Sequence, residues 1–104
     1  MSSSGKGLAG RYAGALYELS VEAKATDTVL ADLTTLKTLL AANADLASLV
    51  ASPVYSRSEQ MNAVVAILNK AGAHALTAKF VGAVAENGRL FALPQIIKAF
   101  IDEV

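Results

Sequence analysis

Residues 85–94 read Ala-Glu-Asn-Gly-Arg-Leu-Phe-Ala-Leu-Pro, and this stretch decides the interpretation of the chain. Gly88 follows a helical pattern and suits the left-handed conformation that ends many helices. Pro94 suits the first turn of a helix, where its missing N–H costs no hydrogen bond. The stretch therefore predicts the end of one helix, a tight corner and the start of another. We expect Arg89 to bond the exposed carbonyls at the end of the first helix, with a direct partner contact as the alternative.

Outward from this corner, alanine and leucine dominate and apolar residues recur every three or four positions, which is the periodicity of a helix. No stretch shows the sustained alternation of a strand. The sequence therefore predicts an all-α protein, a six-helix bundle that forms a single domain. The expected helices cover about residues 6–24, 28–42, 44–51, 56–71, 73–87 and 93–104.

Several polar residues stand where helices are expected to start. Asp27 and Asn43 are the predicted N-caps of the second and third helices. Ser56 and Glu59 have the spacing of a capping box and should open the fourth helix. Pro53 should end the third helix, because the residue before a proline avoids the helical region.

The composition limits what the chain can be. It has 104 residues, of which 54% are hydrophobic and 17% are charged, which is too apolar for a disordered chain. The formal net charge is zero, so electrostatic capture of nucleic acid is not expected. There is no cysteine for a disulfide framework. No apolar run is long enough to cross a membrane, and the N-terminus lacks the apolar core of a secretory signal, so the simplest interpretation is a cytoplasmic protein.

The sequence offers no set of side chains for a reaction. His74 is the single histidine, and its place near a helix start favours a surface or capping role. Asp27, Asp32 and Asp45 fall on separate elements, where solvated helix faces explain them better than acid–base work. No nucleophile, base and orienting group can be combined. We therefore expect no catalytic residue, no bound cofactor and no metal.

The first and fifth helices are the unusual elements, because each is apolar on two sides. On the first helix one stripe contains Leu8, Tyr12, Ala15, Leu16 and Leu19, and the other contains Gly10, Gly14, Tyr17 and Val21. On the fifth helix one stripe contains Leu76, Phe80, Ala83 and Asn87 with Lys79 at its edge, and the other contains Ala78, Val81, Val84 and Ala85. Either both helices are central and buried on both sides by the same chain, or one stripe of each borders an open groove for a partner helix. The periodicity does not choose between the two stripes.

The segment Arg11-Tyr12-Ala13-Gly14-Ala15-Leu16, together with the corner at residues 85–89, resembles the N-terminal domain of the ATP synthase delta subunit family. This family includes the mitochondrial oligomycin-sensitivity-conferring protein. The resemblance implies a six-helix bundle without catalytic activity, which binds the N-terminal helix of an alpha subunit in a groove between helices 1 and 5. It selects Tyr12, Ala15, Leu16 and Leu19 on helix 1, with Leu76, Lys79, Phe80, Ala83 and Asn87 on helix 5, as partner-binding residues.

The resemblance also implies a place in the cell and further partners. The protein would belong to the peripheral stalk, or stator, of an F-type ATP synthase and hold the F1 head while the rotor turns. A second, C-terminal domain would engage the stalk b subunits, and the chain stops at Val104, where the sixth helix would end, so we expect that domain to be absent. The expected location is the cytoplasmic face of the bacterial inner membrane, as a peripheral protein, or alternatively the matrix side of the mitochondrial inner membrane. The isolated domain should be monomeric.

Two other classes of function remain as alternatives. A death-domain-like interaction module would self-associate through charged patches, and the low charge of this chain argues against it. A carrier of an apolar ligand would need a cavity inside the core, whereas a helix-binding domain would need an open trough on the surface.

Overall fold

The computed structural model describes residues 7–104, and in this range the chain forms six α-helices and one short 3₁₀ helix. The elements are α1 (Gly7–Glu22), α2 (Thr26–Ala42), α3 (Ala44–Ala51), α4 (Arg57–Lys70), α5 (Ala75–Glu86), η2 (Leu90–Ala92) and α6 (Leu93–Glu103). No strand occurs among these described residues, so the predicted all-α bundle of six helices is confirmed.

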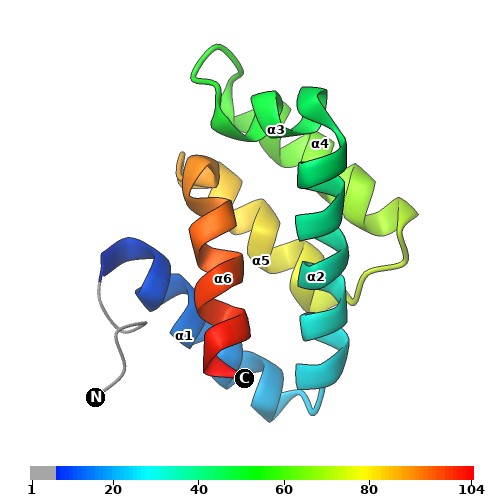
Figure 1. Cartoon of the computed structure of the whole chain (residues 1–104), viewed down its shortest axis with the longest axis vertical. Coiled ribbons are helices and arrows are strands. Elements are labelled where there is room, and N and C mark those ends of the chain that lie inside the picture. Colours follow the sequence, from blue (N-terminus) through cyan, green and yellow to red (C-terminus); the bar gives the residue numbers. More distant parts are fainter. Residues whose placement is uncertain (1–6) are drawn as a thin grey trace.

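Figure 1 shows α6 between α1 and α2, with α5 behind it. The closest helix pairs are α4 with α5 and α1 with α6, while α2 contacts α1, α3, α5 and α6. Short connections favour packing between sequential helices, and α4 with α5 follows this rule. The other close pair, α1 with α6, joins helices from opposite ends of the described chain. α1 and α5 each have one close partner helix, and this leaves part of their surface open.

The last helix supplies much of the core. Leu93, Ile96, Ile97 and Phe100 on α6 are almost completely buried, and their spacing of three and four places them on one face. The ring of Phe100 meets Tyr17 of α1 edge to face, with ring centroids 6.3 Å apart. Truncating a buried phenylalanine to alanine usually costs about 3–5 kcal/mol, so α6 is essential for the bundle.

Several of the predicted helix starts and ends after α2 are confirmed. Asn43 Oδ1 accepts hydrogen bonds from the backbone N–H groups of Asp45 and Leu46, each at 3.1 Å. The corner glycine, Gly88, has φ of 74°, and Pro94 lies in the first turn of α6. The residues between them form the 3₁₀ helix η2, which the sequence pattern did not distinguish from an irregular corner.

The start of the second helix differs from the expected position. Asp27 is not an N-cap, because α2 begins two residues earlier than expected and the capping position belongs to Ala25, which makes no side-chain bond. The hydroxyl of Thr26 instead bonds the buried Ser20 at 3.1 Å, so the helix start is held to α1. Asp27 lies in the first turn of α2, where its charge interacts favourably with the helix dipole. Asp32 lies on the same helix, so the expectation that these two carboxylates fall on separate elements is wrong. Lys6, the predicted start of the first helix, lies outside the described residues.

The start of α5 corrects the interpretation of one carboxylate. His74 is the N-cap, and its Nδ1 accepts from the N–H of Leu76 at 3.0 Å, which confirms the capping role. Asp32 on α2 does not simply face solvent. Its Oδ2 accepts from the N–H of His74 at 2.9 Å and from the hydroxyl of the buried Thr77 at 2.8 Å. Asp32 therefore ties α2 to the first turn of α5.

Candidate functional site

Tyr12 is the centre of the candidate site, because side chains from α1, α5 and the following corner meet there. Its ring contacts Phe80 of α5 edge to face, with ring centroids 6.0 Å apart and an angle of 78° between the planes. The side-chain nitrogen of Asn87 donates to the Tyr12 hydroxyl at 3.0 Å, and Arg89 donates to the same oxygen at 3.4 Å. The ring is therefore held at one end by packing and at the other by hydrogen bonds.

These contacts change the acidity of the phenol. The hydrogen bond from Arg89 has the largest effect and lowers the pKa of Tyr12 below its ordinary value of 10.0, although partial burial acts in the opposite direction. The hydrogen bond from Asn87 and the positive charges of Arg89 and Arg11 add to the lowering. Since the oxygen already accepts from two donors, its own O–H remains available to donate to a partner.

A shallow surface cleft of about 370 Å³ adjoins this tyrosine. Its lining consists of Leu8, Arg11, Tyr12, Ala15 and Arg89. Two cations and no carboxylate are in this lining, and the other side chains are apolar or aromatic. The cleft can therefore accept an apolar surface together with hydrogen-bond acceptors at its edge.

The other residues predicted for the site differ from one another in their exposure to solvent. Leu19 is 45% exposed and Ala15 is exposed, whereas Leu76 and Phe80 are half-buried against the core. Leu16 is 0% exposed, so its prediction as a contact residue is corrected: it belongs to the core and presents no surface.

Ala83 and Lys79 are exposed on α5, and they line a second hollow of about 310 Å³. This hollow is shared with α4, which contributes Met61 and Val65. The structure therefore brings Tyr12, Phe80 and Asn87 into direct contact, and it places Ala83 and Lys79 over the neighbouring hollow.

The alternative stripe of α1 is only partly covered. Gly10 is buried and Tyr17 packs on Phe100 of α6. Gly14 is half-buried, with open space where a Cβ would lie, and Val21 is 51% exposed. On α5 the stripe of Ala78, Val81, Val84 and Ala85 is buried. On α5 the open side is thus the side that carries Ala83, whereas α1 leaves parts of both stripes open, including the side that carries Tyr12.

The sequence did not identify the part that two arginines play in this site. Arg11 lines the cleft, and Arg89 donates to Tyr12 in place of the helix carbonyls that we expected it to bond. The backbone N–H of Arg89 closes the helix instead, by bonding Val84 O at 3.0 Å. Arg11 adjoins the tyrosine in sequence, but the approach of Arg89 depends on a rotamer that no local pattern reveals.

Within residues 7–104 there is no group of three or more His, Cys, Asp or Glu side chains that could hold a metal ion. None of the helices in that range is both long and apolar enough to cross a membrane.

The described chain is thus a small six-helix bundle with a surface cleft whose lining combines apolar and aromatic side chains with two arginines. The model of the family described as "ATP synthase delta (OSCP) subunit" matches residues 8–104 of this sequence. The chain belongs to that family.

Individual relatives agree with this assignment. The chain is 55% identical over 91 residues to the ATP synthase subunit delta of Xanthobacter autotrophicus, an alignment that covers 88% of this chain and 45% of the relative. It is 55% identical over 94 residues to the protein of the same name from Azorhizobium caulinodans, with 90% and 50% covered. With the protein of that name from Nitrobacter hamburgensis it shares 47% identity over 100 residues, with 96% and 54% covered. The chain thus spans about half the length of the curated relatives it matches.

Proposed function

We propose that this chain is the N-terminal domain of an ATP synthase delta subunit, a non-catalytic part of the peripheral stalk. In this role its groove between α1 and α5 binds the N-terminal helix of an alpha subunit and so holds the F1 head against the torque of the rotor. The observation that carries the proposal is the arrangement of Phe80, Asn87 and Arg89 around Tyr12 on an open surface.

The geometry favours binding of a helix over chemistry. Tyr12 presents a large ring whose position is already held, so little conformational entropy is lost when a partner packs on it. Ala15 and Ala83 are small and exposed, which lets a partner backbone approach closely. Around them, Leu19 offers exposed apolar area and Lys79 a charge at the rim. This combination of an aromatic anchor with a polar edge is typical of interface hot spots.

The wider role follows from the family. The proposal places the stalk b subunits in contact with a second domain, which the other half of the relatives' length would supply. The relatives named above are bacterial, which supports a peripheral location on the cytoplasmic face of a bacterial inner membrane. A location on the matrix side of the mitochondrial membrane is the alternative.

Isothermal titration with a peptide of the alpha-subunit N-terminus tests the proposal. We expect saturable one-to-one binding, and no binding of a scrambled peptide with the same composition. Tyr12→Ala should weaken binding by more than about 1 kcal/mol, because it removes the anchor. Ala83→Trp should block binding by filling the surface beside Phe80.

Both variants must keep the circular dichroism spectrum of the parent, since Tyr12 also contacts Phe80. Undiminished binding by both folded variants would contradict the proposed groove. No binding by the parent would contradict the proposed partner.

A further inference from the structure

A second apolar surface lies around Phe91, away from the site just described. Phe91 is in η2, and its side chain is 59% exposed. An exposed phenylalanine at a tight corner carries apolar area that the fold itself does not use. None of the residues that line the Tyr12 cleft lines this surface.

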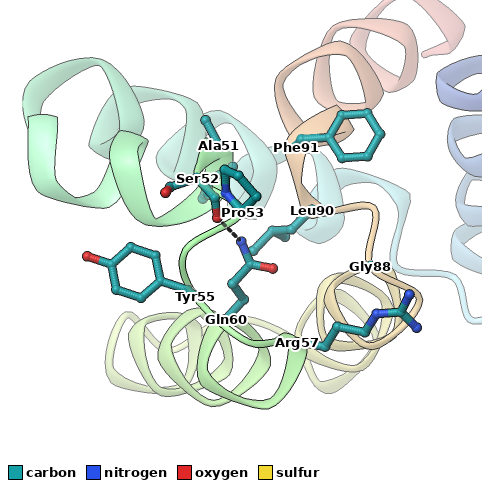
Figure 2. A pocket seen from close by; sticks show the side chains of 10 residues that line it. Ala51, Ser52, Pro53, Tyr55, Arg57, Gln60, Gly88, Leu90 and Phe91 are labelled. Carbon is teal, nitrogen blue, oxygen red and sulfur yellow. Dashed lines mark hydrogen bonds between the residues drawn. The ribbon is translucent and has the colours of Figure 1, made fainter.

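Two clefts meet at Phe91. The larger, of about 450 Å³, is formed by α2, α3 and α6, which contribute apolar side chains such as Leu40, Ala47 and Ile97. The smaller, of about 360 Å³, lies between the end of α3, the loop after it and the corner after α5 (Figure 2). Both clefts are lined by Phe91 and by Val50 and Ala51 of α3, so they form one continuous surface, here called the Phe91 surface.

The walls of the smaller cleft are held in place without a partner. Figure 2 shows the side chain of Gln60 pointing to the backbone at the end of α3, where its Nε2 donates to Leu49 O at 2.8 Å and to Ser52 O at 3.4 Å. The side chain of Arg57 packs closely against Gly88. A Cβ atom added at residue 88 would lie 2.7 Å from the Arg57 guanidinium group. A preformed surface of this kind loses little entropy on binding.

The charges on the Phe91 surface have one sign. Lys37 and Lys98 line the larger cleft and Arg57 lines the smaller one, whereas no carboxylate lines either cleft. Lys98 also pairs with Asp102, at 3.4 Å between two exposed side chains one helical turn apart. Such exposed pairs contribute little, so Lys98 can exchange its partner at small cost.

We infer that the Phe91 surface is a second docking site, and that its occupant is an acidic amphipathic helix of another protein. Apolar side chains of that helix would cover Phe91, and its carboxylates would face Lys37 and Lys98. Helices bind apolar grooves in this way, with anchors at helical spacing, and opposite charges at the rim select the partner and its orientation.

Other occupants fit the surface less well. A second copy of this chain would bring the same three cations against themselves in a twofold interface, which is unfavourable. A nucleic acid needs a row of cations along a phosphate backbone, whereas here the cations surround apolar clefts in a chain of zero net charge. A small anionic amphiphile would occupy the larger cleft alone and leave the smaller one uncovered.

The test uses two synthetic amphipathic helices with identical leucine and alanine faces, one flanked by glutamates and the other by lysines. We expect the glutamate peptide to bind saturably and to shift the backbone amide signals of Phe91, Val50 and Lys98 in NMR spectra. Phe91→Ala should weaken this binding about tenfold, as for an interface anchor. The matched control is Val54→Ala, which removes an 85% exposed side chain that lines neither cleft and should leave the affinity unchanged.

Charge reversal completes the experiment. The double change Lys37→Glu and Lys98→Glu should abolish binding of the glutamate peptide and allow binding of the lysine peptide. Tyr12→Ala should leave binding of the glutamate peptide unchanged, which separates this result from any result on the proposed alpha-subunit groove.

Four outcomes would overturn the inference. The first is equal affinity for both peptides, and the second is a set of signal shifts around Tyr12 instead of Phe91. The third is a dimer of the parent chain in sedimentation that is lost in Phe91→Ala. The fourth is binding of decanoate, a small anionic amphiphile, to the Phe91 surface when the glutamate peptide does not bind. Because the amide shifts are measured on the unaltered chain, the test remains decisive even if a variant fails to fold.

Discussion

The hydroxyl oxygen of Tyr12 lies 3.0 Å from the side-chain nitrogen of Asn87, and this hydrogen bond joins two residues that are 75 positions apart in the chain. It connects the middle of α1 to the C-cap of α5. α1 packs mainly on α6 and α5 mainly on α4, so few other contacts connect these two helices. The contact between α1 and α5 at this end therefore involves the phenol of Tyr12 and the corner that carries Asn87 and Arg89.

Tyr12→Phe should separate the two functions of this side chain. The variant keeps the ring contact with Phe80 and loses the acceptor for Asn87 and Arg89. Because these bonds are exposed, we expect the free energy of unfolding to fall by no more than about 1 kcal/mol in urea titrations. Binding of the alpha-subunit peptide should weaken less than in Tyr12→Ala. A loss equal to that of the alanine variant would mean that the hydroxyl, and not the ring, supplies the affinity.

The acidity of Tyr12 gives a second prediction, on pH. Since the pKa of Tyr12 is lower in the folded state than its ordinary value of 10.0, the folded protein favours the phenolate. The contribution to stability is therefore complete above pH 10.0 and is lost as the pH falls through the lower pKa of the folded state.

Arg89→Gln should raise the pKa of Tyr12, because the hydrogen bond from Arg89 is the largest cause of the lowering. NMR titration of the carbon that bears the hydroxyl measures this directly. The matched variant Arg11→Gln should raise it less, since Arg11 acts only through its charge and is the smallest cause. A larger rise in Arg11→Gln would show that charge, and not hydrogen bonding, controls the phenol.

The fourth helix begins with a complete capping box, which leads to a third prediction. Ser56 Oγ accepts from the N–H of Glu59 at 3.1 Å, and Glu59 Oε1 accepts from the N–H of Ser56 at 2.8 Å. Ser56→Ala should lower the free energy of unfolding by roughly 0.5–2 kcal/mol. Ser58→Ala changes an exposed serine in the same helical turn and should have a smaller effect. Equal losses in the two variants would contradict the capping role of Ser56.

The sequence predicted those features that depend on neighbouring residues. Asn43 and the Ser56–Glu59 pair make bonds within their own helical turn, and Gly88 adopts its positive φ for local steric reasons, so all could be recognised from spacing alone. The binding stripe of α1 was different. The residue pattern did not choose between the two stripes, and the family resemblance alone selected the one with Tyr12. Which residues of a stripe are covered depends on contacts between distant segments, such as that of Tyr17 with Phe100 of α6.

The prediction that Asp32 simply faces solvent was wrong for the same reason, because its contacts join segments that are far apart in the sequence. Its i+3 and i+4 neighbours on α2 gave no reason to expect a partner, because the groups it binds lie 42 and 45 residues further along the chain. A carboxylate that accepts from a helix N-terminus of a distant segment cannot be distinguished by spacing from one that faces water.

Asp32 therefore provides the last prediction. Its Oδ2 accepts from the N–H of His74 and from the hydroxyl of Thr77, which is completely buried. Asp32→Ala leaves both donors without this acceptor, and the loss of a buried partner costs about 1–3 kcal/mol in the free energy of unfolding.

The matched control is Asp27→Ala, which removes an exposed carboxylate from the first turn of the same helix and should cost less, since only the helix dipole is affected. Thr77→Val removes the buried donor together with its need for a partner. The double variant Asp32→Ala with Thr77→Val should therefore lose less stability than the sum of the two single variants. Strictly additive losses in urea titrations would show that the two side chains act independently, and that Asp32 stabilises α5 only through its bond to the backbone of His74.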